Sequence, residues 1–198
     1  MNRFAFKFLI LHFSIFLLLA TACSRKKDAA PVDLGPAPTV SNFVLKNLAS
    51  EFPGEIKTAE FSGKVQLILF FRTDDDACLG ALADWNSLQK DFAGRGFALV
   101  GAIVDDRSVA QITAETAALG AAFPVGLADA RIVAAFGGPA AIRAIPTAFL
   151  LSRAGLPLRT YAGYEPFDHL RDDIARALDG QELADRNPKA IAPEDNAP

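Results

Sequence analysis

The 198-residue sequence contains two cysteines, and the residues around each suggest chemistry. Cys23 directly follows three small residues, 20–22, which end an apolar run. Cys78 lies two residues after three consecutive aspartates at positions 74–76. Two cysteines and two histidines are too few for a disulfide-rich scaffold, and they exclude a His/Cys zinc site. Sulfur chemistry in this chain is therefore confined to Cys23 and Cys78.

The first 22 residues have the layout of a secretory signal peptide. Residues 1–7 carry two positive charges and no acid, residues 8–19 are mostly apolar, and residues 20–22 are small. The apolar run is shorter than the roughly 20 residues that a membrane-spanning helix needs. We therefore expect residues 1–22 to be removed as a leader.

Residues 19–23, Leu-Ala-Thr-Ala-Cys, resemble the lipobox of bacterial lipoproteins, although Ala20 stands where leucine is more usual. The resemblance implies cleavage before Cys23 and acylation of its sulfur. Acyl chains would hold the protein on the bacterial cell membrane, on the periplasmic or extracytoplasmic side. Ser24 favours the outer membrane if the bacterium has two. The alternative is ordinary cleavage near Ala22, which would leave Cys23 as a free thiol.

Composition divides the remaining chain into a tether, a domain and a tail. Residues 23–40 contain three basic residues, three prolines and no apolar periodicity, which is typical of a flexible linker. Residues 180–198 contain three prolines, several charges and few apolar residues, which predicts a disordered tail. Residues 41–179 are left as one domain. Without the leader the chain has 18 basic and 23 acidic residues, so no nucleic-acid partner is expected.

The apolar pattern of the domain alternates between strands and helices. Residues 65–71 and 97–104 are nearly continuous apolar runs, as in strands buried on both faces. Helical spacing follows each run, first with Leu79, Leu82, Trp85, Leu88 and Phe92 on one face and then at 108–119 after the capping residue Ser108. The other expected elements are extended pieces at 43–45 and 56–58, a short helix at 131–136, a hairpin at 147–151 and 158–161, and a helix at 166–178. This order predicts an α/β domain with parallel strands and an antiparallel edge.

The order of elements and several short motifs resemble the thioredoxin fold, in particular the membrane-anchored TlpA/ResA type of thiol–disulfide oxidoreductase, a redoxin. The resemblance spans about residues 36–178. It rests on 63–65 (Gly-Lys-Val), 96–101 (Gly-Phe-Ala-Leu-Val-Gly), 123–125 (Phe-Pro-Val) and, most specifically, 144–150 (Ala-Ile-Pro-Thr-Ala-Phe-Leu). It implies a mixed sheet with flanking helices and, here, an N-terminal β extension. It also implies that Pro146 is cis and faces the site, and that Ile145 pairs through its backbone with a protein or thiol partner.

The segment that matches the redox motif departs from the family. The family has Cys-x-x-Cys at the start of the first long helix, whereas residues 75–78 here read Asp-Asp-Ala-Cys. Asp75 stands in place of the nucleophilic cysteine, and Cys78 matches the resolving one. A carboxylate cannot usefully attack a disulfide sulfur, so a two-thiol cycle within one chain is excluded.

Opposing effects act on Cys78. The N-terminus of a helix favours the thiolate, whereas burial and three neighbouring aspartates disfavour it. The residue is therefore a small buried apolar group, or else the thiol of a monothiol or peroxidase-like site. His169 lies in the last predicted helix, so no Cys–His pair is expected.

The acidic run has two interpretations. Carboxylates of Asp74, Asp75 and Asp76 suit a helix N-terminus, where they cap free N–H groups. Asp105 and Asp106 follow the neighbouring parallel strand, so they should emerge at the same edge of the sheet. Together these carboxylates could bind Ca²⁺ or Mg²⁺ or receive a basic partner. We assign no metal and no cofactor.

The sequence therefore predicts an extracytoplasmic, lipid-anchored, thioredoxin-like protein without its nucleophile. Such a protein would bind polypeptide at the groove around Ile145 and Pro146. The alternative is a monothiol oxidoreductase working through Cys78, alone or with a thiol of a partner. A third possibility is a metal-dependent or purely structural envelope protein, so whether the chain is an enzyme stays open.

Overall fold

The structure is a computed structural model that describes residues 39–48 and 54–184. The predicted leader, Cys23, nearly all of the tether and most of the predicted tail lie outside these residues. The described residues belong to one compact unit. Within them, no helix is both long enough and apolar enough to cross a membrane.

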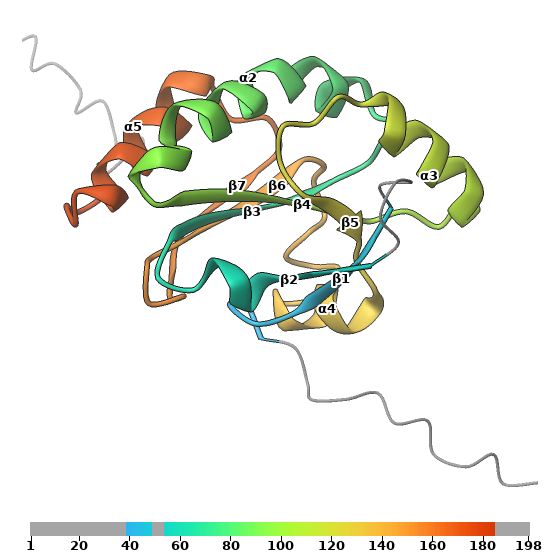
Figure 1. Cartoon of the computed structure of the whole chain (residues 1–198), viewed down its shortest axis with the longest axis horizontal. Coiled ribbons are helices and arrows are strands. Elements are labelled where there is room, and N and C mark those ends of the chain that lie inside the picture. Colours follow the sequence, from blue (N-terminus) through green and yellow to red (C-terminus); the bar gives the residue numbers. More distant parts are fainter. Residues whose placement is uncertain (1–38, 49–53, 185–198) are drawn as a thin grey trace, which may run out of the picture. The chain divides into compact units, whose positions relative to one another are not determined.

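One seven-stranded mixed sheet forms the centre of the domain (Figure 1), in the spatial order β2-β1-β5-β4-β3-β6-β7. Its central strands β3, β4 and β5 are parallel, while β6 and β7 on one side and β1 and β2 on the other are antiparallel to their neighbours. The strand bounds are β1 Val44–Asn47, β2 Glu55–Lys57, β3 Val65–Phe71, β4 Phe97–Ile103, β5 Val125–Leu127, β6 Thr147–Leu151 and β7 Pro157–Ala162. The predicted thioredoxin-like fold with its N-terminal β extension is confirmed.

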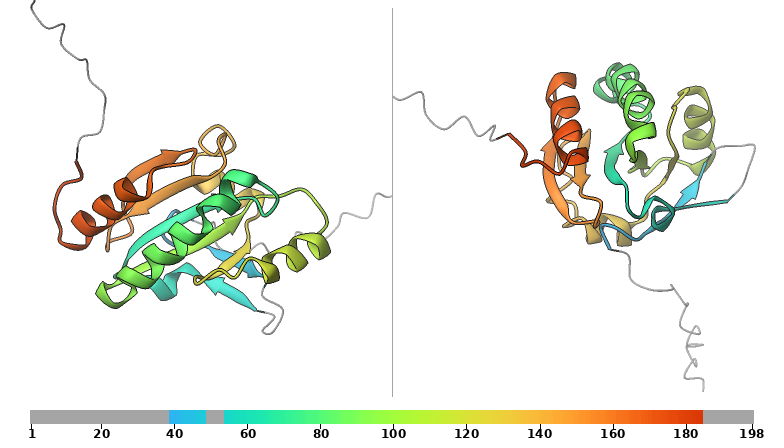
Figure 2. Two further views of the ribbon diagram at one scale, coloured as in Figure 1. Left: turned by 90° about the horizontal axis from the view of Figure 1, so that it is seen from above. Right: turned by 60° about the vertical axis from the view of Figure 1, so that its left-hand side comes forward.

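Helices cover both faces of the sheet. Figures 1 and 2 show α2, α3 and α5 on one face and α4 on the other. The α-helices are α2 Asp76–Phe92, α3 Val109–Ala118, α4 Ala130–Ala135 and α5 Phe167–Leu178, and two 3-10 turns lie at Thr58–Phe61 and Ala93–Arg95. Gly96, at φ 86°, ends the second turn in a left-handed conformation that glycine adopts without strain.

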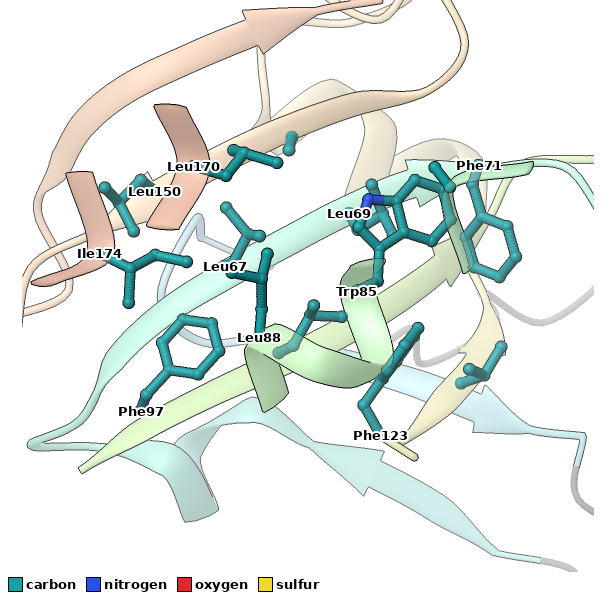
Figure 3. Close-up of a cluster of buried hydrophobic side chains, with 14 of the residues drawn as sticks. Leu67, Leu69, Phe71, Trp85, Leu88, Phe97, Phe123, Leu150, Leu170 and Ile174 are labelled. Carbon is teal, nitrogen blue, oxygen red and sulfur yellow. The ribbon is translucent and has the colours of Figure 1, made fainter. Parts of the chain in front are cut away.

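Strand β3 contributes to two cores because successive side chains point to opposite faces. All seven of its residues are buried. Leu67, Leu69 and Phe71 face α2 and α5, where they pack with Trp85 and Leu170 (Figure 3). On the other face, Ile68 and Phe70 pack in a second cluster that includes Phe43, Phe136 and Phe149. The prediction that 65–71 is buried on both faces is confirmed.

Three local predictions need correction. Leu79 was placed on the buried face of α2, but it is 44% exposed. The buried face instead follows Cys78, Ala81, Trp85, Leu88 and Phe92, and Leu79 lies one residue, or about 100°, away from it. The three-residue strand β5 was not predicted, since it is too short to show a period. The ordered domain also continues past Gly180, because Leu183 packs against the core and the Ala184 carbonyl accepts a hydrogen bond from Arg159.

Candidate functional site at the carboxyl edge of the sheet

The carboxyl ends of β3 and β4 place the predicted site residues together. The two strands pair in parallel with Phe71 opposite Ile103, so the segments that follow them leave the sheet at the same edge. Thr147 pairs with Phe70, which places Pro146 at this edge as well. The expectation that the carboxylates after β3 and β4 emerge together is correct.

Asp75 caps helix α2. Its backbone is extended, at φ −99° and ψ 123°, and its Oδ1 accepts a hydrogen bond from the Cys78 N–H at 2.9 Å. A carboxylate at this position satisfies a free helical N–H group and interacts favourably with the helix dipole. The Asp75 carboxylate is therefore committed to a structural hydrogen bond.

Cys78 is buried in the first turn of α2, at 1% exposure, and it is a free thiol. The pKa of the Cys78 thiol is raised to about 12, chiefly by burial and in smaller part by the carboxylates of Asp75 and Asp74. A backbone hydrogen bond at Arg72 opposes this rise only in part. At neutral pH the sulfur is therefore both buried and protonated. A protonated thiol is not the nucleophilic form.

Two arginines that the sequence analysis did not single out lie among the carboxylates of this edge. Arg107 donates from Nε and Nη2 to the fully buried Asp105 carboxylate, at 2.7–3.1 Å, and from both Nη atoms to Glu115, at 2.8 and 2.9 Å. It also donates to Thr73 Oγ1 at 2.9 Å, and that hydroxyl donates to Glu115 Oε2 at 2.5 Å. We call Thr73, Asp105, Arg107 and Glu115 the Arg107 cluster; it joins the segments after β3 and β4 to helix α3.

Arg72 extends the pairing to the acidic run. It donates to both oxygens of Asp74, at 2.9 and 3.1 Å, and it lies 3.8 Å from Asp105 and 3.9 Å from Asp106. Hydrogen bonds from Arg72 lower the pKa of Asp74, and those from Arg107 lower the pKa of Asp105. The carboxylates of Asp74 and Asp105 are thus held as ions by these arginines.

The pairing with arginines occupies carboxylates that a Ca²⁺ or Mg²⁺ site at this edge would use. Among residues 39–48 and 54–184, no group of three or more His, Cys, Asp or Glu side chains is arranged to hold a metal ion. Asp74 and Asp105, which such a site would need, direct their oxygens to guanidinium groups. The sequence analysis did not predict these ion pairs because no recognisable spacing marks Arg72 and Arg107 as partners of the aspartates.

The segment around Pro146 is the other part of the site. The Ile145–Pro146 peptide bond is cis, and the Pro146 carbonyl accepts a hydrogen bond from Gly163 N at 2.8 Å. Beside it lies a small hollow of about 10 Å³, lined by Trp85 and Tyr164 among others. This volume holds about one water molecule. Tyr164 is 56% exposed at the rim of this hollow.

Ile145 keeps its backbone free for a partner. The residue is half-buried, and among the described residues its N–H and C=O groups make no hydrogen bond. Free backbone groups beside a sheet edge are the groups that pair with an extended polypeptide. The predicted role of Ile145 is thus compatible with its geometry.

Comparisons with known proteins agree with this fold. No protein-family model matches the sequence, and a search of curated proteins gave no match. Solved structures do match, including two from Chlorobium tepidum. A thiol:disulfide interchange protein of the thioredoxin family is 25% identical, with a TM-score of 0.61 over 74% of this chain and 99% of its own. A putative thiol:disulfide interchange protein DsbE is 22% identical, with a TM-score of 0.61 over 73% and 99%.

The same fold also occurs in a lipoprotein. The exposed lipoprotein thioredoxin of Streptococcus pneumoniae is 18% identical, with a TM-score of 0.59 over 68% of this chain and 98% of its own. At these identities the likeness establishes the fold rather than the activity. The chain is therefore a thioredoxin-fold protein that resembles the thiol:disulfide interchange proteins.

Proposed function

We propose that this protein is a redox-degenerate, thioredoxin-like module that binds polypeptide at the edge formed by Ile145 and Pro146. The observation that carries the proposal is the pairing of Asp75 with the buried Cys78. The position of the nucleophile holds a helix cap, and the remaining thiol is 1% exposed. The fold keeps its binding edge while the group that would attack a disulfide is missing.

Three features of the edge favour a polypeptide partner. Ile145 offers unpaired backbone groups for strand-like pairing. Leu79, which is 44% exposed near the start of α2, and Tyr164, which is 56% exposed just after β7, add apolar surface to this edge. Asp106, 95% exposed, places a carboxylate at the same edge, where it would suit a basic side chain of the partner.

The alternative function is a monothiol oxidoreductase working through Cys78. Its support is weaker because attack needs the thiolate, and burial raises the pKa of Cys78 to about 12. Such an enzyme would have to open the first turn of α2 before each reaction.

We further propose that acylated Cys23 holds the protein on the extracytoplasmic side of a bacterial membrane, the outer membrane where there are two. The support is the lipobox-like segment at 19–23 and the occurrence of this fold in a lipoprotein of Streptococcus pneumoniae. Mass spectrometry of the mature N-terminus tests the anchor. Acyl mass on Cys23, lost together with detergent-phase partition in Cys23→Ala, is the expected result, and a mature N-terminus at any other residue would refute it.

Binding is tested with an unfolded probe that has no thiols. Fluorescent, reduced and carboxymethylated α-lactalbumin cannot form a mixed disulfide, so its anisotropy reports non-covalent binding alone. We expect Ile145→Asp to weaken binding at least roughly tenfold, since a desolvated carboxylate opposes an apolar contact. Leu158→Asp, the same kind of change at an exposed leucine of β7, should leave binding unchanged.

An insulin-reduction assay separates the two functions. The module should reduce insulin no faster than the buffer. Reduction by the wild-type protein that disappears in Cys78→Ala would establish the monothiol enzyme instead. Equal loss of probe binding in Ile145→Asp and Leu158→Asp would show that the probe does not use the Pro146 edge.

A further inference from the structure

The end of the domain opposite Pro146 is built around the β6–β7 turn. The guanidinium of Arg153, in this turn, donates to the carbonyls of Gly63, Arg95 and Leu178, each at 3.3 Å. These contacts tie the turn to the starts of β3 and β4 and to the end of α5. We call this part of the molecule, residues 152–158 with Gly63 and Lys64, the tether end.

The chain reaches the domain at the same place. Ser41 lies against Gly155 so closely that a Cβ atom on Gly155 would be 2.5 Å from the Ser41 Cβ. The described chain begins two residues earlier, at Thr39. The segment that connects the domain to Cys23 therefore starts beside the β6–β7 turn.

The tether end and the Pro146 edge are at opposite ends of β6. This strand begins at Thr147, directly after Pro146, and ends at Leu151, directly before the turn. Five residues of extended strand cover roughly 17 Å. A surface in contact with the tether end would therefore leave the Pro146 edge free on the far side.

The tether end presents an ordered apolar tip. Leu156 is 63% exposed and Leu158 is 43% exposed. Three hydrogen bonds fix the turn: Ser152 N to the Leu156 carbonyl at 2.8 Å, Gly155 N to the Ser152 carbonyl at 2.9 Å, and Leu156 N to Ser152 Oγ at 3.1 Å. Because the turn is ordered, Leu156 is held in one orientation. Binding of this leucine to an apolar surface therefore costs little conformational entropy.

Cations accompany this tip. Arg153 is exposed and uses its guanidinium for carbonyl groups, so its charge is not neutralised by these contacts. Lys64 lies 5.6 Å from the ring centre of Phe61. Opposing charges at this end are Glu60, in the neighbouring 3-10 turn, and Asp179, which pairs with Arg95 at 2.8 Å.

We propose that the tether end rests on the lipid bilayer, with Leu156 in the headgroup region and Arg153 and Lys64 at anionic headgroups. This inference rests on the proposed anchor at Cys23. Thr39 is 16 positions after Cys23, and a flexible chain of that length has an end-to-end distance of roughly 20 Å. Such a tether keeps the tip at high effective concentration near the membrane, so that a small apolar and cationic contact adds to the lipid anchor. The Pro146 edge then faces away from the bilayer and toward its partners.

Photo-crosslinking from the bilayer tests this orientation. The acylated protein is placed in vesicles of phosphatidylethanolamine and phosphatidylglycerol that contain a diazirine-bearing phospholipid, and crosslinked peptides are mapped by mass spectrometry. We expect crosslinks at residues 152–158 to exceed those at 105–109 at least tenfold. Leu156→Asp should remove most of them, whereas Leu79→Asp, at the other end, should not.

A second arm separates this inference from the anchor. The chain that starts at Cys23, in the Cys78→Ala background, is coupled through its Cys23 thiol to a maleimide lipid in the same vesicles. If cells leave Cys23 unacylated but this chain still crosslinks through the turn, the anchor is wrong and the surface is right. Equal crosslinking at both ends, or β7-to-β7 protein crosslinks in place of lipid ones, would overturn the membrane surface.

Discussion

Cys78 and Asp105 are two buried ionisable groups at the same edge of the sheet, and the protein treats them in opposite ways. Asp105 has a guanidinium within 2.7 Å, so its pKa is lowered and the carboxylate stays charged. At Cys78, burial and, to a smaller extent, the carboxylates of Asp75 and Asp74 raise the pKa to about 12, so the sulfur stays neutral. Burial disfavours the charged form of both groups. Hydrogen bonds from Arg107 outweigh burial at Asp105, whereas at Cys78 the neighbouring carboxylates act in the same direction as burial, so the thiol stays neutral.

The largest expected effect concerns the reactivity of Cys78. At pH 7 a thiol with a pKa of about 12 has a thiolate fraction about three thousandfold smaller than an ordinary cysteine with a pKa of about 8.5. Native protein should therefore react with a thiol reagent at least roughly a thousandfold more slowly than the unfolded protein. Stopped-flow titration before and after denaturation measures this. Equal native and unfolded rates would contradict the buried thiol.

Replacing Asp75, the N-cap residue of α2, with cysteine should create an activity that we expect the wild type to lack. Asp75→Cys restores Cys-x-x-Cys, and because the side chain at 75 already reaches the Cys78 N–H, its sulfur should be within disulfide range of Cys78. We expect an intramolecular disulfide and measurable insulin reduction, slowed by Asp74 and Asp76. Asp76→Cys is the matched control, since residues two apart on a helix point in different directions. Two thiols that never oxidise together would show that residues 74–78 do not hold the geometry of the redox motif.

Removing Arg107, the cation that pairs with Asp105, tests the comparison from the side of the charged group. Arg107→Met keeps much of the apolar stem and the backbone N–H that donates to Asp105, but the guanidinium that remains near the buried carboxylate is that of Arg72, at 3.8 Å. An uncompensated buried charge is strongly destabilising, so we expect the melting temperature to fall by roughly 5–10 °C. Arg131→Met, at a position away from the cluster, serves as the control. An unchanged melting temperature in Arg107→Met would mean that Asp105 does not depend on this pair.

The carboxylates that pair with Arg72 and Arg107 determine how the stability of the fold should respond to acid. The pKa values of Asp74, Asp105 and Glu115 are lowered in the folded protein. Their contribution to stability is therefore present above the pKa of an unfolded carboxyl group, near 4, and is lost as the pH falls through the lower folded values. Urea denaturation should show a steep loss of stability below about pH 4. This acid-dependent loss should be smaller in Arg107→Met, and an unchanged slope there would argue against the cluster as its source.

The smallest expected effect is the removal of the sulfur itself. Cys78→Ala deletes one buried atom in the first turn of α2, so the free energy of unfolding should fall by about 1 kcal/mol. Cys78→Ser should cost more, because its hydroxyl group is more polar in the same apolar surroundings. Urea denaturation of both variants measures the difference. A serine variant as stable as the alanine variant would indicate a polar environment at this position.

Much of the fold follows from the sequence. Residues 65–71 and 97–104 are nearly continuous apolar runs, as in fully buried strands, and the structure contains β3 and β4 there. Ser108 and Gly120 mark the ends of α3 because capping and left-handed turns are local properties of the chain. The missed elements have weaker local signals: β5 is three residues long, and its pairing with β4 supplies what its own pattern lacks.

The sequence by itself also determined that the predicted domain, residues 41–179, contains one cysteine, Cys78, so no disulfide can form within it. It could not determine which charges meet at the edge. Arg72 and Arg107 are 35 positions apart and come together with Asp105 only because β3 and β4 run parallel in one register. The pKa of Cys78 is likewise a tertiary property, because burial under α2 and the neighbouring carboxylates, rather than residue type, decide whether sulfur carries a charge.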